Sequence, residues 1–414
     1  MADGKQDFSI RSVAIVVFVP TLLFSIGEGA LIPLIPIAAT NLGASLAIAG
    51  VIAGMLMIGE LAGDIPSGWL VSRIGERTAM IGAAFLSILA ALGAVLAPNP
   101  WVLGASVFVL GLATAVFALA RHAFMTSYVP IRYRARALST LGGVFRAGLF
   151  IGPLISVPVI HVTGGAQGAF WIMAATCLAA VLILLLMPDP ESLFGRVDRS
   201  RRGAKAEQPA DTSHGLFRTL WSFRGVLARM GSGAALIGGM RAARTLILPL
   251  WAVSLGVSEA NTALIIGLAG ALDFALFYVS GQVMDRFGRS WSAVPSTLGL
   301  GLGMLLLAFT HDIPNAVVWF IVAAGVLSVA NGLGSGILMT LGADLAPPGR
   351  PAPFLGAWRF TADAGSATAP LVVSGLTALV SVSFAAGTVG IFGILGAVHL
   401  ARMIPRYIPA RPGR

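Results

Sequence analysis

The chain has 414 residues, of which 57% are hydrophobic and only 11% are charged, and its formal net charge is +10. A soluble domain carries about 25% charged residues, so most of this surface cannot face water, and an ordinary soluble domain is excluded. The single cysteine, Cys177, excludes an intrachain disulfide or a thiolate metal cluster, and the five histidines show no ligand spacing. We therefore expect no metal site.

Apolar stretches about as long as a membrane-spanning helix, roughly 20 residues, follow one another along the chain. They lie at approximately 13–38, 46–71, 79–97, 101–126, 137–160, 168–187, 232–254, 261–284, 292–310, 315–341, 354–379 and 383–403. The sequence thus predicts an all-α membrane protein with twelve transmembrane helices. The first stretch is too long for a signal peptide and no small-residue cleavage site follows it, so we expect it to remain as a span.

Basic residues fall on alternate loops between these stretches. One set of loops, with the middle segment and the C-terminal tail, carries Arg73, Arg77, Arg132, Arg134, Arg136, Arg196, Arg199, Arg286, Arg289, Arg350, Arg402 and Arg406. The other loops, such as "AATNLGAS" and "HDIPN", contain no Lys or Arg. Because positively charged loops stay in the cytoplasm, we predict cytoplasmic termini and a multi-pass protein of the plasma membrane or bacterial inner membrane. Topology thus accounts for the positive charge, and no nucleic-acid partner is expected.

The segment 188–224 differs from its surroundings, since it is polar and charged with Pro and Gly interspersed. This composition is typical of a solvent-exposed linker, and the segment separates six apolar stretches from six others. We predict an N-terminal six-helix bundle over 1–187, a cytoplasmic linker over 188–224, a C-terminal six-helix bundle over 225–403 and a cytoplasmic tail over 404–414.

The two predicted bundles contain the same short motif. Residues 67–77 read "SGWLVSRIGER" and residues 280–290 read "SGQVMDRFGRS", 213 positions later (280 − 67). Other landmarks recur at nearly the same interval, as Pro153 and Pro370 do at 217 positions (370 − 153). The sequence therefore predicts two homologous, pseudo-symmetric halves, an arrangement that places a substrate site near the bilayer midplane between them.

The repeated motif follows the pattern Gly-X-X-X-Asp-Arg-X-Gly-Arg. The second copy is complete and consists of Gly281, Asp285, Arg286, Gly288 and Arg289, whereas the first keeps Gly68, Arg73, Gly75 and Arg77 and has Ser72 in place of the Asp. Lying after spans two and eight, this motif resembles the signature loop of the major facilitator superfamily, whose members are transporters and not enzymes. The resemblance covers nearly the whole chain, because the number of spans, the linker and the repeat also match.

The resemblance implies a role for the signature loops in gating. In the family the loop holds the cytoplasmic side closed in the outward-facing state, with its Asp against the start of a helix from the other half. A carboxylate at a helix N-terminus is stabilised by up to ~2 kcal/mol. We therefore expect a stronger contact at Asp285, facing span five, than at Ser72, facing span eleven.

A second motif, in span five, bears on the direction of transport. Gly148, Gly152 and Pro153 form Gly-X-X-X-Gly-Pro, which resembles the motif of the 12-span drug:proton antiporters within the family. Helix packing through small residues is the alternative interpretation. The pattern also departs from the exporters in span four, where the subgroup usually has an Arg midway. Here Val107 stands at that place, and Arg121 lies close to the predicted cytoplasmic end, within reach of the interface.

Charges inside the predicted spans are candidates for the transport mechanism, because a charge at the bilayer centre costs about 2.5 kcal/mol or more. They are Glu28, Glu60, Arg146, Arg241, Arg244, Asp273 and Asp363, with Asp64 and Arg359 nearer the cytoplasmic face. From the family's arrangement of spans we expect Glu28 and Arg244 to face the cavity and Arg146 to meet Asp273. Asp363 with Arg359 should meet Glu60 or Asp64. Alternatively, these pairs only hold the halves together.

The sequence thus predicts a secondary transporter working by alternating access, most simply the proton-coupled export of a small amphiphilic or drug-like molecule. A proton-coupled importer or facilitator of a small metabolite in the same fold is the alternative. No nucleotide-binding motif is found, so we expect no cofactor and a proton gradient as the energy source. We assign the proton to Glu28, with Asp64 and Asp273 as the next candidates. The expected partners are a small-molecule substrate, protons and the lipid bilayer, and the protein is expected to act as a monomer.

Overall fold

The computed structural model describes residues 17–129, 131–186, 220–347 and 351–408, and the regular elements in these ranges are helical. In the first half of the chain they are α2 (Val19–Leu31), α3 (Ile35–Asn41), α4 (Leu46–Ile74), α5 (Glu76–Val95), α6 (Pro100–Tyr128), α7 (Ile131–Thr163) and α8 (Gly168–Leu186). In the second half they are α12 (Arg224–Val226), η2 (Leu227–Gly231), α13 (Ser232–Ser254), α14 (Glu259–Phe287), α15 (Ser290–Phe309), α16 (Ala316–Leu333), α17 (Ile337–Leu345), α18 (Pro351–Leu379) and α19 (Val382–Tyr407).

Within the described residues, ten helical segments are long and apolar enough to cross a membrane, and the pair α2 and α3, bent by 43°, is an eleventh candidate. The remaining long helix, α18, has 29 residues and is therefore about 43 Å long at 1.5 Å per residue. Its polar stretch "TADAGSAT" lowers its hydropathy. The predicted all-α membrane fold is confirmed, whereas the count of twelve spans and the cytoplasmic termini stay predictions.

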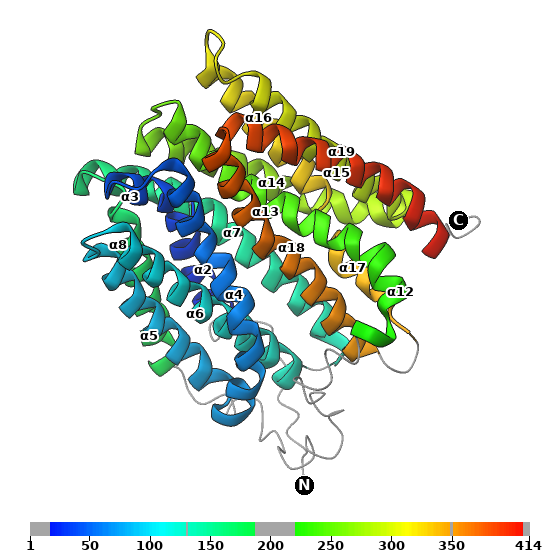
Figure 1. The fold of residues 1–414 in the computed structure, drawn as a ribbon. Coiled ribbons are helices and arrows are strands. Elements are labelled where there is room, and N and C mark those ends of the chain that lie inside the picture. The colour runs from blue at the N-terminus through cyan, green and yellow to red at the C-terminus, as the bar shows by residue number, and fades with distance from the viewer. Residues whose placement is uncertain (1–16, 130, 187–219, 348–350, 409–414) are drawn as a thin grey trace.

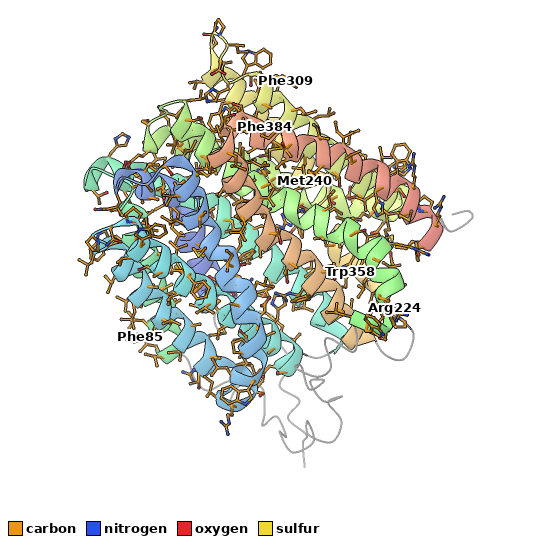
Figure 2. The ribbon with its side chains drawn as sticks, viewed as in Figure 1. Phe85, Arg224, Met240, Phe309, Trp358 and Phe384 are labelled. Carbon is orange, nitrogen blue, oxygen red and sulfur yellow. The ribbon has the colours of Figure 1, made fainter. Side chains whose placement is uncertain are left out.

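Apolar side chains on the outside of the bundle fit a lipid environment. Figure 2 shows Phe85, Phe309 and Phe384 at the periphery, and their exposed fractions are 55%, 78% and 48%. Met240, in contrast, lies inside the bundle and is 2% exposed. An aqueous surface could not carry so many large apolar groups without association, so the exterior is the face that contacts lipid.

Figure 1 shows the two halves side by side, the first coloured blue to green and the second green to red, and their helices pack in corresponding pairs. In the first half α2 packs on α7, α4 on α6, and α5 on α8, and in the second half α13 packs on α18, α14 on α16, and α15 on α19. The pseudo-symmetric architecture therefore follows the sequence repeat. Most of the predicted linker lies outside the described residues. Helix α19 continues past the predicted end of span twelve, so the first residues of the predicted tail, up to Tyr407, are helical.

The two halves meet along α7 with α14 and along α4 with α18. We call the end of the bundle where α7 and α18 begin the linker end, and the opposite end, where α3 finishes and α14 begins, the far end. At the far end Asn41 Nδ2 donates a hydrogen bond to Glu259 Oε1 at 2.8 Å, and residues there from both halves, such as Ala39 and Leu250, belong to one hydrophobic cluster that extends along the bundle. At the linker end each half has its own cluster. The protein is thus closed at the far end, which the predicted orientation makes an inward-facing state.

Proline and glycine explain where these helices bend and stop. Between α2 and α3, Pro33 has no backbone N–H to continue the helical ladder. Helices α4 and α14 end at Gly75 and Gly288, with φ of +85° and +96°, a conformation that glycine adopts without steric cost. The repeated glycine of the signature loop therefore allows the same reversal of the chain in both halves.

Candidate functional site

Three helices bring three arginines and one aspartate together where the halves meet. Arg146 comes from α7, Arg241 and Arg244 from α13, and Asp273 from α14. Residues three apart on a helix share a face, so both arginines of α13 point the same way. An Arg146 nitrogen lies 3.5 Å from Asp273 Oδ1, and an Arg244 nitrogen lies 3.6 Å from Oδ2. We call these four residues, with Asn331, the cationic cluster.

Hydrogen bonds from α16 and its break position this cluster. The Asn331 amide donates to Asp273 Oδ2, and Arg244 Nη2 donates to Ser328 Oγ at 2.6 Å. Arg241 Nη2 donates to the Gly334 carbonyl at 2.5 Å, in the break that follows the end of α16. The guanidinium of Arg146 lies 5.0 Å from the ring centre of Phe277. Three of the four charged groups are therefore held by polar partners of the second half.

A cavity of about 170 Å³ opens beside the cationic cluster. Arg146, Arg244 and Asp273 line one side of it. The rest of its wall is mostly apolar and includes Ile32, Pro33, Leu149, Phe150, Leu248 and Phe274. Because Ile32 and Pro33 form the break between α2 and α3, the bent span is part of the wall. The cavity therefore joins a charged side to an apolar side, an arrangement that suits an amphiphilic ligand.

A second group of charges lies toward the linker end, between α2, α4, α6 and α18. We call it the acidic cluster, and its members are Glu28, Glu60, Asp64, Arg121, Arg359 and Asp363. An Arg359 nitrogen of the second half lies 3.7 Å from Asp64 Oδ1 of the first half and another lies 3.3 Å from Asp363 Oδ2. Arg359 is 58% exposed, so this contact between the halves is a wet one and contributes little to stability.

Glu28 is the most enclosed carboxyl group of the acidic cluster. It is 5% exposed, and within the described residues its Oε2 atom has no hydrogen-bond partner. Arg121 of α6 acts on it electrostatically. Arg121 is itself buried, 6% exposed, and its guanidinium lies 4.5 Å from the ring centre of Phe145. A buried carboxyl and a buried guanidinium without a close ion pair form an arrangement that can change its protonation when helices move.

The structure brings together the expected charge pairs. Arg146 meets Asp273, and Arg359 meets Asp64 and Asp363. Of the two residues expected to face the cavity, Arg244 lines it and pairs with Asp273 of its own half, whereas Glu28 is not among the lining residues. On α2, Gly29 packs against Leu149 of α7 and Gly27 against α8. This rotation places the Glu28 side chain near Arg121 of α6 rather than across the cavity.

Sequence reasoning missed two groups and misplaced one. Arg121 is buried instead of reaching the interface, since α6 continues to Tyr128 and leaves it two turns inside the helix. Asn331 and Ser328 were not singled out, although an amide within the apolar stretch "VLSVANGL" is a signal that could have found Asn331.

The signature loops are held within their own halves. Arg77 donates to the Leu184 carbonyl at 2.8 Å through Nε, and Ser72 donates to the Trp69 carbonyl at 2.8 Å. In the second copy Arg289 Nε donates to Asp344 Oδ2 at 2.8 Å, and this bond raises the pKa of Arg289.

The other charged residues of the signature loops lie at the surface, and the space beside Gly68 and Gly281 is open. Asp285 is 85% exposed and lies 3.5 Å from Arg289, while Arg73 and Arg286 lie over Trp69 and Phe287. Added Cβ atoms would meet only one distant atom at Gly68 and none at Gly281. An exposed Asp285 fits a bundle that is open at the linker end, and its contact in a closed state stays a prediction.

The glycine motif of α7 serves close packing against α2. A Cβ added at Gly148 would lie 2.9 Å from the Ile26 nitrogen, and one at Gly152 would lie 2.8 Å from the Gly29 carbonyl carbon. Pro153 lines the cavity. The motif therefore seats the helix that carries Arg146 directly against the helix that carries Glu28.

The family model described as Major Facilitator Superfamily matches residues 17–370 and 230–414. Solved transporters share the fold at low identity. A POT family transporter in complex with a thioalcohol-conjugated peptide is 13% identical, with a TM-score of 0.75 over 96% of this chain and 97% of the other. A D-xylose-proton symporter is 18% identical, with a TM-score of 0.71 over 98% of this chain and 99% of the other. A nucleoside transporter is 15% identical, with a TM-score of 0.70 over 96% of this chain and 100% of the other. No curated protein matches by sequence.

Proposed function

The chain belongs to the major facilitator superfamily and is a secondary transporter rather than an enzyme, and from that premise we propose that it exports a small amphiphilic molecule in exchange for protons. Glu28 carries the proposal, since it is a buried carboxyl whose Oε2 has no hydrogen-bond partner among the described residues, and it lies on the span that breaks beside the cavity. We place the transporter in the plasma or inner membrane as a monomer.

The proposed cycle uses the two clusters for different tasks. The cavity holds the substrate between its apolar wall and the cationic cluster. Glu28 binds a proton in one state of the transporter and releases it in the other, when the rocking of α2 changes its distance from Arg121. Intramembrane carboxyl groups commonly serve such proton relays. In antiport, inward movement of the proton is linked to outward release of the substrate.

Alternating access requires the two ends of the bundle to open in turn. In the inward-facing state the Asn41–Glu259 hydrogen bond and the shared apolar cluster close the far end. We propose that the opposite state opens these contacts and closes the linker end through Asp285 and the start of α7. The pairs Arg146–Asp273 and Arg359–Asp64 cross between the halves, so they change partners or distance in each cycle.

Export is the direction favoured by the span-five motif, which resembles that of proton antiporters. The D-xylose-proton symporter of the same fold is the specific reason to keep proton-coupled import as the second candidate. The two functions differ in which polarity of the proton gradient drives accumulation inside a vesicle, so a single transport assay separates them.

Proteoliposomes with an internal pH dye test the proposal with a panel of small anionic, neutral and cationic amphiphiles. A transported compound should drive proton movement opposite to its own. Glu28→Gln should reduce the rate of this proton movement at least tenfold. The variant should still exchange the same labelled compound across the membrane. Glu28→Asp should keep part of the activity.

Glu76→Gln is the matched control, because Ser127 donates to Glu76 Oε1 at 2.7 Å and an amide oxygen can accept the same bond. It should keep proton coupling. If folded, inserted Glu28→Gln protein transports against a gradient at the parental rate, Glu28 is not the proton carrier. Asp64 and Asp273 are then examined next, followed by Glu60.

A further inference from the structure

The cationic cluster has more positive charge than its own residues compensate. It contains three guanidinium groups and one carboxylate, a formal charge of +2 (3 − 1). Asp273 is the carboxylate that acts on Arg146, Arg241 and Arg244 alike. Uncompensated charge in a poorly hydrated site is unfavourable, so an additional anion would stabilise this cluster.

The arginines also have hydrogen-bond donors to spare. A guanidinium offers five N–H donors. Within the described residues the Nε atoms of Arg241 and Arg244 are buried without a partner, whereas the more exposed Arg146 contacts Asp273 and the Phe277 ring. The two ion pairs with Asp273, at 3.5 and 3.6 Å, are longer than the roughly 2.7–2.9 Å of a charge-assisted hydrogen bond. Asp273 therefore leaves room for a second acceptor.

The cavity places these donors beside an apolar chamber. Arg146 and Arg244 line it, and their side chains are 25% and 12% exposed. Phe150 and Phe274, whose ring centres lie 5.1 Å apart, face the same space together with Leu149 and Leu248. An entering molecule thus meets two cations at one side and hydrocarbon at the other.

We propose that the substrate is a small amphiphilic carboxylate whose acid group binds between Arg146 and Arg244, with Asp273 as the competing anion. This inference rests on the proposed transport function and specifies its substrate class. A guanidinium matches the planar carboxylate with two parallel N–H donors. Because Arg146 belongs to the first half and Arg244 to the second, a carboxylate bound to both joins the halves and is released when they separate.

Calorimetric titration of the purified, detergent-solubilised full chain tests the site without requiring transport. The probes are three carboxylates, benzoate, hexanoate and 2-naphthoate, each with its neutral amide, and benzamidine as the cation matched in shape to benzoate. At least one carboxylate should bind, and more tightly than its amide. Arg146→Gln and Arg244→Gln should each weaken its binding about tenfold or more, the loss expected for a hydrogen bond to a charged group.

Asp273→Asn should instead tighten carboxylate binding, since it removes the competing anion and keeps an oxygen for Asn331. If the cluster were purely structural, the arginine and aspartate variants would not change the affinity for the carboxylate in opposite directions. Arg229→Gln is the matched control, because Arg229 bonds Tyr407 Oη at 3.1 Å outside the cavity, and it should leave affinity unchanged. The inference is overturned if none of the carboxylates binds, if amides or benzamidine bind as tightly, or if Asp273→Asn weakens binding.

The result also separates this inference from the proposed function. Carboxylate binding that depends on Arg146 and Arg244, without substrate-driven proton movement in vesicles, would support the site and refute proton-coupled transport. Proton-coupled transport of a neutral or cationic compound that is unaffected by Arg146→Gln would support the function and refute the carboxylate site.

Discussion

The cationic and acidic clusters are related by the pseudo-symmetry of the two halves and carry opposite net charge. The sequence repeat relates Arg146 to Asp363, Arg244 to Glu28, and Asp273 to Glu60. One cluster lines the cavity and is held by hydrogen bonds from Asn331, Ser328 and Gly334. The other contains a buried carboxyl, Glu28, without a hydrogen bond at Oε2 within the described residues.

The difference suggests how one fold divides two tasks. A charge that is hydrogen-bonded on several sides is fixed in position, which is what recognition of a substrate needs. A carboxyl without such bonds gains less from remaining ionised, which is what reversible proton binding needs. We therefore infer that duplication supplied two equivalent charge sites, of which the cationic cluster recognises substrate and the acidic cluster binds the proton. The three predictions below test this division, in order of decreasing effect.

Removing Arg121 should destabilise the acidic cluster strongly, because it leaves Glu28 without the cation that acts on it. A buried charge that loses the opposite charge nearest to it is strongly destabilised. Arg121→Gln should therefore lower the unfolding temperature markedly, and adding Glu28→Gln should restore much of the loss. Cys177, the single cysteine and fully buried, allows unfolding to be followed by its reaction with a fluorogenic maleimide. Additive losses in the double variant would show that the two groups do not interact.

The sequence predicted the fold well because membrane helices are encoded by long apolar stretches that tertiary structure rarely overrides. It also placed Arg146 opposite Asp273, since both the repeat and the family arrangement bring spans five and eight together. The sequence could not predict which cation lies near Glu28, because the rotation of α2 depends on contacts that no local pattern encodes. Gly27 packs closely against α8 and Gly29 packs closely against α7. These two contacts set the rotation of α2 that turns Glu28 toward Arg121.

Changes in the close packing between α2 and α7 should have the next largest effect on stability. This packing fixes the distance between Glu28 of the acidic cluster and Arg146 of the cationic cluster. A Cβ at position 152 would lie 2.8 Å from the Gly29 carbonyl carbon, and overpacking of this kind costs about 1–3 kcal/mol. Gly152→Ala should therefore lower the unfolding temperature and slow transport.

Gly142→Ala is the matched control on the same helix, since a Cβ there meets no atom within 4 Å. It should be neutral or slightly stabilising, because alanine favours the helix. Equal unfolding temperatures for the two variants would show that α7 can move away from α2 at little cost.

The signature loops should give the smallest effect and extend the comparison to gating, since the halves differ there too. Asp285→Asn removes the carboxylate expected to meet the start of α7 when the linker end closes. A helix N-terminus stabilises a carboxylate by about 1 kcal/mol, so the ratio of closed to open forms should fall about fivefold. Ser72→Ala should change little, because the Ser72 hydroxyl donates to the Trp69 carbonyl of its own helix. Spin labels at Thr78 and Arg402, exposed at the linker end of each half, would report the distance distribution in a Cys177→Ala background. Equal shifts from both substitutions would refute the asymmetry, and with it the view that the second half contributes the stronger of the two gates.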